Sequence, residues 1–218
     1  CATAVNAMDS VDGMETYQLS CGLQGGAANI YTIFGDSTTT LTAPAAYQAD
    51  APFGANVGGV SPAFVAVSAT AAYDSWLTVG ITDGDTGGAL GAIGLDFASW
   101  TATSGLTSDD GAVFWMVPDD GPSTSAVLAQ VTVTGDLLAT LNVQGRSLSG
   151  EDYQAIGLSY SSSGGTSSDF LTAYTSGHWG NHYHGWMYAF TTYYGVGHRK
   201  YRFHCSEGNL NLTEKVGK

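Results

Sequence analysis

The chain has 218 residues, of which 44% are hydrophobic and only 11% charged, and its formal net charge is −13. This length suits one large domain or two small ones, and the hydrophobic content excludes a largely disordered chain. The negative charge argues against nucleic acid as a partner, because the protein would repel a phosphate backbone.

The charge is unevenly distributed along the sequence. Residues 1–145 contain fourteen Asp or Glu and no Lys, Arg or His, whereas all six Lys and Arg and all five His follow that segment. This segregation predicts an acidic body and a nearly neutral tail. It favours divalent cations, a cationic surface or the basic tail of a neighbouring copy as partners.

The sequence contains no apolar run approaching the ~20 residues that span a bilayer, and no basic start followed by an apolar stretch. The first residue is Cys1 rather than Met. We therefore expect a mature, secreted or cell-surface chain without a transmembrane segment.

Runs of β-branched and aromatic residues, bounded by Gly, Asp and Pro, recur along the first part of the chain, and no window shows sustained helical spacing. This rhythm predicts an all-β fold. Residues 126–133 alternate between a wholly apolar and a mixed face, which is typical of a two-layer β-sandwich or jelly roll with antiparallel sheets. The clearest predicted strands are residues 29–34, 63–68, 73–79, 112–117, 126–133 and 137–143.

Two features between these strands suggest ligands. Asp83 and Asp85, separated by a glycine, resemble the opening of a calcium loop, although the Glu that would close an EF-hand is absent. The other interpretation is that Asp and Gly are there because turns need them. Trp76 would form a platform for sugar rings if it were exposed.

Several stretches within residues 30–153 resemble a secreted β-domain of microalgal and marine bacterial surface proteins. The resemblance implies an extracellular setting and assigns no catalytic residues. The stretches that carry it are residues 51–59 (APFGANVGG), 62–64 (PAF), 74–80 (DSWLTVG), 93–97 (IGLDF), 111–122 (GAVFWMVPDDGP), 144–147 (QGRS) and 150–153 (GEDY).

The C-terminal part differs from this body. We expect an acidic β-sandwich body over residues 1–160, a Ser/Gly linker or loop over residues 161–168, and an aromatic, His-rich β-ribbon tail over residues 169–218. In the tail, residues 182–194 alternate as one long strand, and residues 198–205 form the predicted return strand. A two-stranded ribbon is marginal in water, so it should pack on the body or on a neighbouring subunit.

His182 and His184 share one face of the predicted strand, which is a common way to present two imidazoles to Zn²⁺ or a similar metal, and His178 could complete the set. A His-x-His pair is a weak signal, and an interface strand that tolerates His is the competing interpretation. The tail residues that we expect at an interface are Trp186, Tyr188, Phe190, Arg199 and Arg202.

Three cysteines are an odd number, so at least one lacks a partner within the chain. Cys21 and Cys205 lie outside the two ends of the strand-rich region, and we expect them to form a disulfide, with Cys1 left over. Three reduced thiols are the alternative. Residues 211–213 (NLT) make Asn211 a potential N-glycosylation site.

Together these patterns predict a non-enzymatic, extracellular structural protein that assembles into a filament, coat or matrix through its C-terminal ribbon. The sequence contains no Gly-x-Ser-x-Gly nucleophile elbow and no phosphate-binding loop. Two other functional classes remain open. One is a secreted carbohydrate-binding module, with or without Ca²⁺, and the other is a metalloenzyme that uses His182 and His184.

Overall fold

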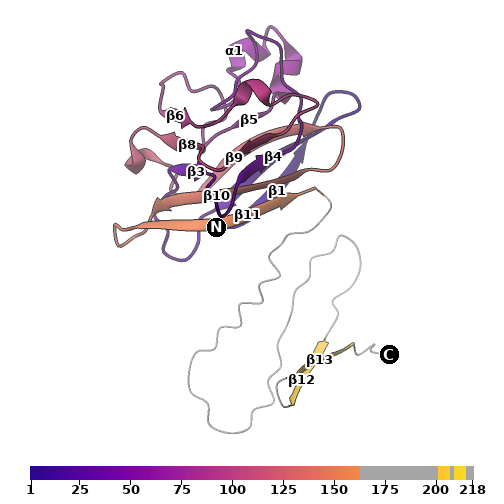
Figure 1. The fold of residues 1–218 in the computed structure, drawn as a ribbon, viewed down its shortest axis with the longest axis vertical. Helices are drawn as coiled ribbons and strands as arrows, with labels where there is room; N and C mark the ends of the chain where they lie inside the picture. Colours follow the sequence, from indigo (N-terminus) through magenta and orange to yellow (C-terminus); the bar gives the residue numbers. More distant parts are fainter. Residues whose placement is uncertain (163–200, 207–208, 215–218) are drawn as a thin grey trace. The chain divides into compact units, whose positions relative to one another are not determined.

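The computed structural model describes residues 1–162, 201–206 and 209–214. Residues 1–162 contain two antiparallel sheets that pack as a sandwich, so the all-β prediction is confirmed (Figure 1). None of the helices among the described residues is both long and apolar enough to cross a membrane.

The smaller sheet has the strand order β1-β2-β9-β5. Its strands are β1 (Ala2–Met8), β2 (Glu15–Gly22), β9 (Ser125–Val133) and β5 (Trp76–Leu77). The larger sheet has the order β6-β8-β3-β10-β4-β7, and β11 pairs with β10. Its strands are β6 (Leu90–Ile93), β8 (Ala112–Trp115), β3 (Thr32–Phe34), β10 (Leu138–Arg146), β4 (Leu41–Ala43), β7 (Leu106–Ser108) and β11 (Asp152–Ser161).

The core lies between the two sheets and follows the alternation of the long central strands. Leu19, Leu128, Val131, Leu141 and Val143 are at most 3% exposed and belong to one continuous cluster. These side chains come from β2, β9 and β10, the strands with the longest ladders in each sheet. In β10 the core side chains alternate as Ala139, Leu141 and Val143. In β9 the alternation shifts by one residue at Leu128 and Ala129, both of which lie in the core, beside the irregular register with β2.

The predicted strands at 112–117, 126–133 and 137–143 correspond to β8, β9 and β10, and residues 29–34 shorten to β3. The strand predicted at 63–68 is wrong, because the short helix α1 (Pro62–Val65) lies there. Ser61 accepts a hydrogen bond from the Ala63 backbone nitrogen at its N-terminus, and Pro62 occupies the first helical position. The predicted strand at 73–79 reduces to β5, preceded by the 3-10 helix η1 (Ala69–Tyr73).

One buried carboxylate anchors the loop that precedes α1. The Asp74 side chain is 1% exposed and accepts hydrogen bonds from the backbone nitrogens of Ala49 at 2.7 Å and Ala55 at 2.6 Å. Burial raises the pKa of Asp74 to about 6, while its bonds from the backbone N–H groups of Ala49, Ala55 and Ser75 act in the opposite direction. The loop at residues 49–55 is therefore tied to the sandwich through a side chain that reads as a turn residue in the sequence.

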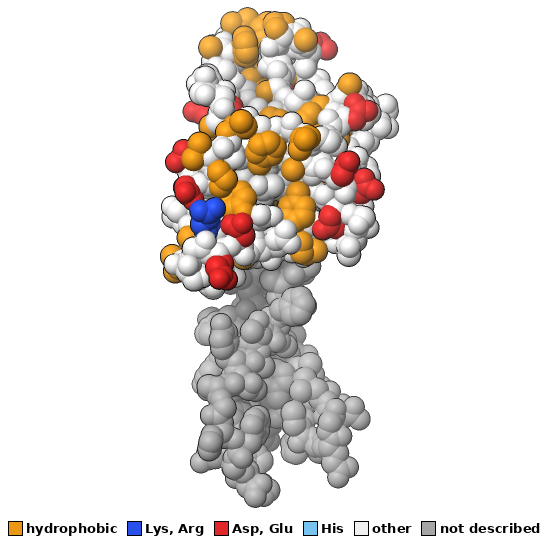
Figure 2. Space-filling view, turned by 60° about the vertical axis from the view of Figure 1, so that its left-hand side comes forward, with side chains coloured by type: hydrophobic (Ala, Val, Ile, Leu, Met, Phe, Trp, Pro, Cys, Tyr) orange, Lys and Arg blue, Asp and Glu red, His pale blue; other side chains and the backbone are white. Residues whose placement is uncertain are grey.

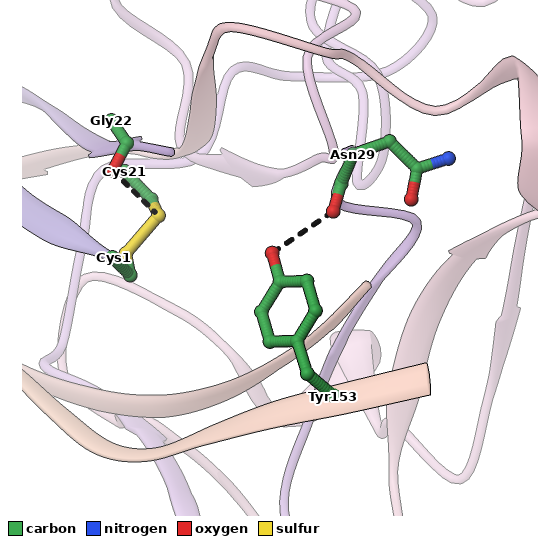
Figure 3. The surroundings of a disulfide bond; sticks show 5 residues. All are labelled: Cys1, Cys21, Gly22, Asn29 and Tyr153. Atoms are coloured by element: carbon green, nitrogen blue, oxygen red, sulfur yellow. Dashed lines mark hydrogen bonds between the residues drawn. A yellow bond between two sulfur atoms is a disulfide. The ribbon is translucent and has the colours of Figure 1, made fainter. Parts of the chain in front are cut away.

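The disulfide predicted between Cys21 and Cys205 is wrong, because Cys21 is bonded to Cys1 (Figure 3). The antiparallel register of β1 and β2 pairs Ala2 with Gly22 and Thr3 with Cys21. This pairing brings Cys1 next to Cys21, with a Cα–Cα distance of 5.3 Å. The bridge therefore fastens the first residue of the chain to a strand whose Cys21 side chain is fully buried.

Two further elements are described in the C-terminal part. Strands β12 (Tyr201–Ser206) and β13 (Asn209–Glu214) pair antiparallel, with Cys205 opposite Leu210 and His204 opposite Asn211. The predicted strand at 198–205 thus overlaps β12, and its described partner is β13. The partner that we predicted, residues 182–194, lies outside the described residues, as does the linker from residue 163 onward.

Candidate interaction surface

The strand register of the larger sheet places a set of apolar side chains on the face that points away from the core. Val113 and Ile33 are paired, fully buried and point inward. Ala112 and Phe114, on either side of Val113 in the strand, point outward. Ala112 pairs with Ile93 of β6 on one side and with Phe34 of β3 on the other. We call this surface the β8 face, and it consists of Phe34, Gly91, Ile93, Ala112, Phe114 and Met116.

The apolar side chains of the β8 face lie close together and are partly exposed to solvent. Ile93 is 65% exposed and Met116 61% exposed. A Cβ atom at Gly91 would lie 2.8 Å from the Phe114 ring and 3.1 Å from the Met116 sulfur, so both side chains lie over the Gly91 backbone. In the view toward the side of the body that carries β6 and β8, hydrophobic side chains gather on the surface with acidic side chains around them (Figure 2).

Carboxylates lie at both ends of β8. Asp109 and Asp110 precede the strand, and Asp119 and Asp120 follow it in the 3-10 helix η3 (Pro118–Asp120), and all four residues are exposed. Exposed apolar surface rimmed by polar groups is typical of a site for protein association. The rim here is acidic, so it would favour a partner with positive charge.

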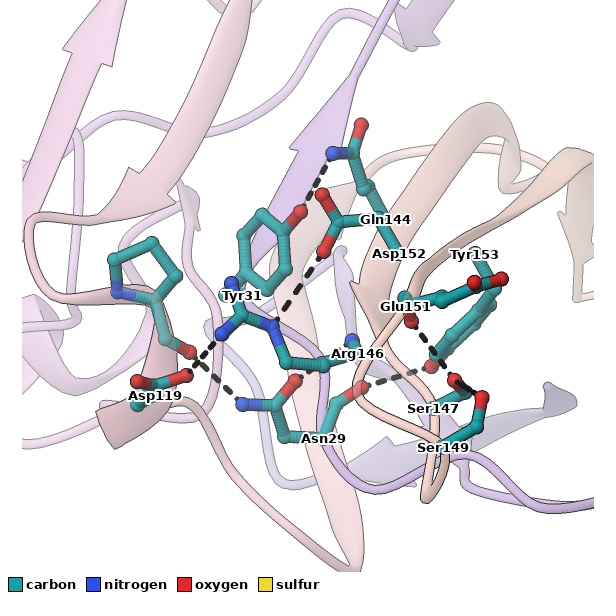
Figure 4. Close-up of polar contacts among 11 residues, drawn as sticks. Asn29, Tyr31, Asp119, Gln144, Arg146, Ser147, Ser149, Glu151, Asp152 and Tyr153 are labelled. Carbon is teal, nitrogen blue, oxygen red and sulfur yellow. Dashed lines mark hydrogen bonds and ion pairs between the residues drawn. The ribbon is translucent and has the colours of Figure 1, made fainter.

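Arg146 is the single Lys or Arg within residues 1–162, and it lies in a polar cluster near this rim (Figure 4). Its Nη1 lies 2.8 Å from an Asp119 carboxylate oxygen, and its Nε lies 3.5 Å from Asp152. The Arg146 backbone nitrogen donates to the Asn29 side chain, whose amide donates to the Pro118 carbonyl oxygen at 2.8 Å. The guanidinium is thus already neutralised by two carboxylates and does not make the surface basic.

Two tyrosines complete this cluster. The Tyr153 hydroxyl donates to the Asn29 carbonyl oxygen at 2.9 Å, and the Gln144 amide donates to the Tyr31 hydroxyl at 2.6 Å. Burial raises the pKa of both tyrosines above the usual value, and for Tyr31 the Gln144 bond acts in the opposite direction. The cluster holds the β10–β11 hairpin against η3 and against the chain before β3. Its role is therefore structural.

The candidate calcium residues Asp83 and Asp85 lie in the turn that precedes β6. The two Asp85 carboxylate oxygens accept hydrogen bonds from the Ala89 and Leu90 backbone nitrogens at 2.8 and 2.7 Å, so this side chain fixes the turn that enters β6. Asp83 is exposed nearby. Within residues 1–162, His, Cys, Asp and Glu side chains form no group of three or more that could hold a metal ion.

Trp76 is not the exposed platform that sugar binding would need, because it is 2% exposed and packs in a small second cluster with Val60 and Ala71. It occupies β5, which pairs with β9 at the edge of the smaller sheet, and its side chain is nonetheless buried. Three candidate residues of the tail lie in described strands, Arg202 and Cys205 in β12 and Asn211 in β13. The remaining candidates of the tail lie outside the described residues: His178, His182, His184, Trp186, Tyr188, Phe190 and Arg199.

A cleft of about 490 Å³ lies where β2 begins and β9 ends, and it was not predicted from the sequence. Its charged lining residues are Glu15 and Asp136, and the Tyr17 hydroxyl donates a hydrogen bond to Glu15. That bond is the main reason why the pKa of Tyr17 is raised. Two acids and a phenol do not provide a nucleophile with an adjacent base, so the cleft indicates no particular reaction.

Comparisons with protein-family models, with curated proteins and with solved structures found no match to this chain. The function is therefore inferred from the fold and from the residues described above.

Proposed function

We propose that this protein is a non-enzymatic subunit of an extracellular filament, coat or matrix, in which the C-terminal segment of one copy binds the body of the next. The observation that carries the proposal is the separation of charge between the two parts. Residues 1–162 contain sixteen Asp or Glu and one Arg, a net charge of −15, and residues 163–218 contain three acids and five Lys or Arg, a net charge of +2, which together give −13.

Two bodies of charge −15 repel each other, so direct contact between bodies is unfavourable. A contact between the body of one copy and the tail of another brings opposite charges together, which favours association and fixes the orientation. Such a contact is head-to-tail, and a head-to-tail contact propagates into a filament unless its rotation closes a ring.

Two observations support an extracellular setting. The Cys1–Cys21 disulfide suits an oxidising compartment, and Asn211 begins a glycosylation sequence.

Two observations in the body bear on the carbohydrate-binding alternative. Trp76 is buried, so it offers no platform to a sugar ring, and both Asp85 oxygens accept hydrogen bonds from backbone amides. A metal site on His178, His182 and His184 is tested separately by elemental analysis of the purified full chain. One zinc, copper, iron or manganese per chain would favour the metalloenzyme, and much less than one would argue against it.

Sedimentation velocity of the full chain at physiological salt tests the assembly proposal. We expect oligomers whose size grows with protein concentration and shrinks in 1 M NaCl, because the contact is between opposite charges. A variant that ends at residue 177 should remain monomeric. If the full chain is a monomer at every concentration, the proposed function is wrong.

A further inference from the structure

We infer that the β8 face is the surface on which the C-terminal aromatic segment of a second copy docks, through residues 182–202. This inference rests on the proposed function and adds to it the place of the contact. The occupant is a segment of the same protein, and the receiving surface is the outward face of the larger sheet.

The first argument is apolar complementarity. The β8 face exposes Ile93 and Met116 beside a Phe114 ring that lies flat on Gly91. Monomeric soluble proteins rarely expose large contiguous apolar patches unless a partner covers them. Residues 182–194 (HYHGWMYAFTTYY) contain no Asp, Glu, Lys or Arg, and seven of the thirteen are Trp, Tyr, Phe or Met. In an extended conformation Trp186, Tyr188 and Phe190 would share one side, which fits a flat apolar sheet face.

The second argument is the position of charge around the apolar residues. The carboxylates of Asp109 and Asp110 lie before β8, and those of Asp119 and Asp120 follow it. On the proposed occupant, Arg199, Lys200 and Arg202 follow the uncharged aromatic stretch after four further residues. Asp119 is already paired with Arg146, so the rim carboxylates left to attract this basic end are Asp109, Asp110 and Asp120. An apolar centre with an acidic rim thus matches an aromatic segment followed by a basic one.

Docking of the segment onto its own body is the competing arrangement. The nineteen residues from 163 to 181 could extend to roughly 60 Å, so chain length alone permits it. The two arrangements differ in one measurable property, because docking on the same copy gives a monomer and docking on a second copy gives oligomers.

The test uses the full chain with single substitutions of exposed residues. Ile93→Asp places a charge on the β8 face, where Ile93 is 65% exposed on the edge strand β6, and we expect it to weaken self-association at least tenfold. Val67→Asp is the matched control, since Val67 is 74% exposed beyond α1 and the variant carries the same added charge. It should assemble like the wild type. Circular dichroism and urea unfolding establish that both variants are folded.

A mixing experiment then identifies the two sides of the contact. The triple variant Arg199→Glu, Lys200→Glu, Arg202→Glu keeps the β8 face but loses the basic end of the segment. Alone, it and Ile93→Asp should each stay monomeric. Mixed, they should form dimers and nothing larger, because one contributes an intact segment and the other an intact face.

The outcomes separate the inference from the proposed function. If the wild type assembles and Ile93→Asp assembles equally well, the β8 face is not the docking surface, although the assembly function stands. If both variants are monomeric and their mixture is monomeric too, the pairing of face and segment is wrong. If the wild type itself never assembles, the proposed function fails and this inference fails with it.

Discussion

The carboxylate of Asp74 lies 2.6 Å from the backbone nitrogen of Ala55, although the two residues are 19 positions apart in the sequence. The other oxygen of the same carboxylate accepts a hydrogen bond from Ala49. A single buried side chain therefore closes the loop at residues 49–55 from both ends. Loops seldom contain regular hydrogen-bond ladders, so this one depends on Asp74 for its backbone partners.

Replacing Asp74 with Asn should destabilise the body by roughly 1–3 kcal/mol at pH 7. The substitution keeps one oxygen acceptor but turns an NH₂ group toward a backbone N–H group, which leaves two buried donors facing each other. Urea unfolding measures the change. Asp83→Asn is the control, because Asp83 is exposed and the same chemical change there should alter the free energy of unfolding by less than about 0.5 kcal/mol.

The stability of the body should also depend on the protonation of Asp74. The pKa of this group is about 6 in the folded protein, against about 4 in an unfolded chain. The folded state therefore binds the proton more tightly, and the contribution of Asp74 to stability increases as the pH falls from 7 toward 4. The expected gain between pH 7 and pH 5 is about 1 kcal/mol.

The measurement for this effect is the difference in unfolding free energy between the wild type and Asp74→Asn at pH 7 and pH 5. The variant lacks the titrating group, so the gain on acidification should be smaller in it by about 1 kcal/mol. The other carboxylates titrate in both proteins and cancel in the comparison. An equal pH response in the two proteins would contradict the raised pKa.

The long strands of the sandwich could be predicted from the sequence, and the shorter elements could not. In β10 an apolar side chain at every second position matches burial against the core, so pattern and structure agree. In β9 the core-facing side changes at Leu128 and Ala129, and Val127 packs against the smaller cluster instead. Residues 112–117 are uniformly apolar, so the sequence predicts a strand there without indicating which side chains point inward. Only the register with β3 and β6 shows that Val113 points inward while Phe114 points outward.

Other features had weak or misleading sequence signals. Ser61 followed by Pro62 is a helix-start signal, but the apolar residues after it favoured a strand in the prediction. Asp74 precedes Ser and Trp and looks like any turn residue, because its burial depends on a loop 19 to 25 positions away. The Cys1–Cys21 pairing depends on the register of β1, a strand with few large apolar residues to mark it.

Tyr160 and Tyr153, both on β11, offer a matched pair of substitutions. The Tyr160 side chain is 1% exposed, and within the described part of the chain its hydroxyl has no hydrogen-bond partner. Burial also raises the pKa of Tyr160 strongly, because removing the phenol from water disfavours its ionised form. The Tyr153 hydroxyl, by contrast, donates to the Asn29 carbonyl oxygen.

Tyr160→Phe should therefore stabilise the body by between zero and about 1 kcal/mol. The substitution removes a buried hydroxyl that loses its hydrogen bond to water on folding and gains none within the protein. Tyr153→Phe should destabilise it by about 1 kcal/mol, because a hydrogen bond is lost. Thermal and urea unfolding of both variants give the comparison. A loss of stability in Tyr160→Phe that equals the loss in Tyr153→Phe would mean that the Tyr160 hydroxyl has a partner.

The Cys1–Cys21 disulfide should contribute about 3 kcal/mol to the stability of the oxidised chain by the chain-entropy model, since it closes a loop with a sequence separation of 20 residues. Cys1→Ser should lose about that amount, and a reducing agent should lower the stability of the wild type to a similar level while leaving the variant unchanged. Digestion before aspartates without reduction should release residues 1–8 linked to residues 12–35. A linkage of Cys21 to Cys205 instead would overturn the pairing, and it would make the first strand independent of any disulfide.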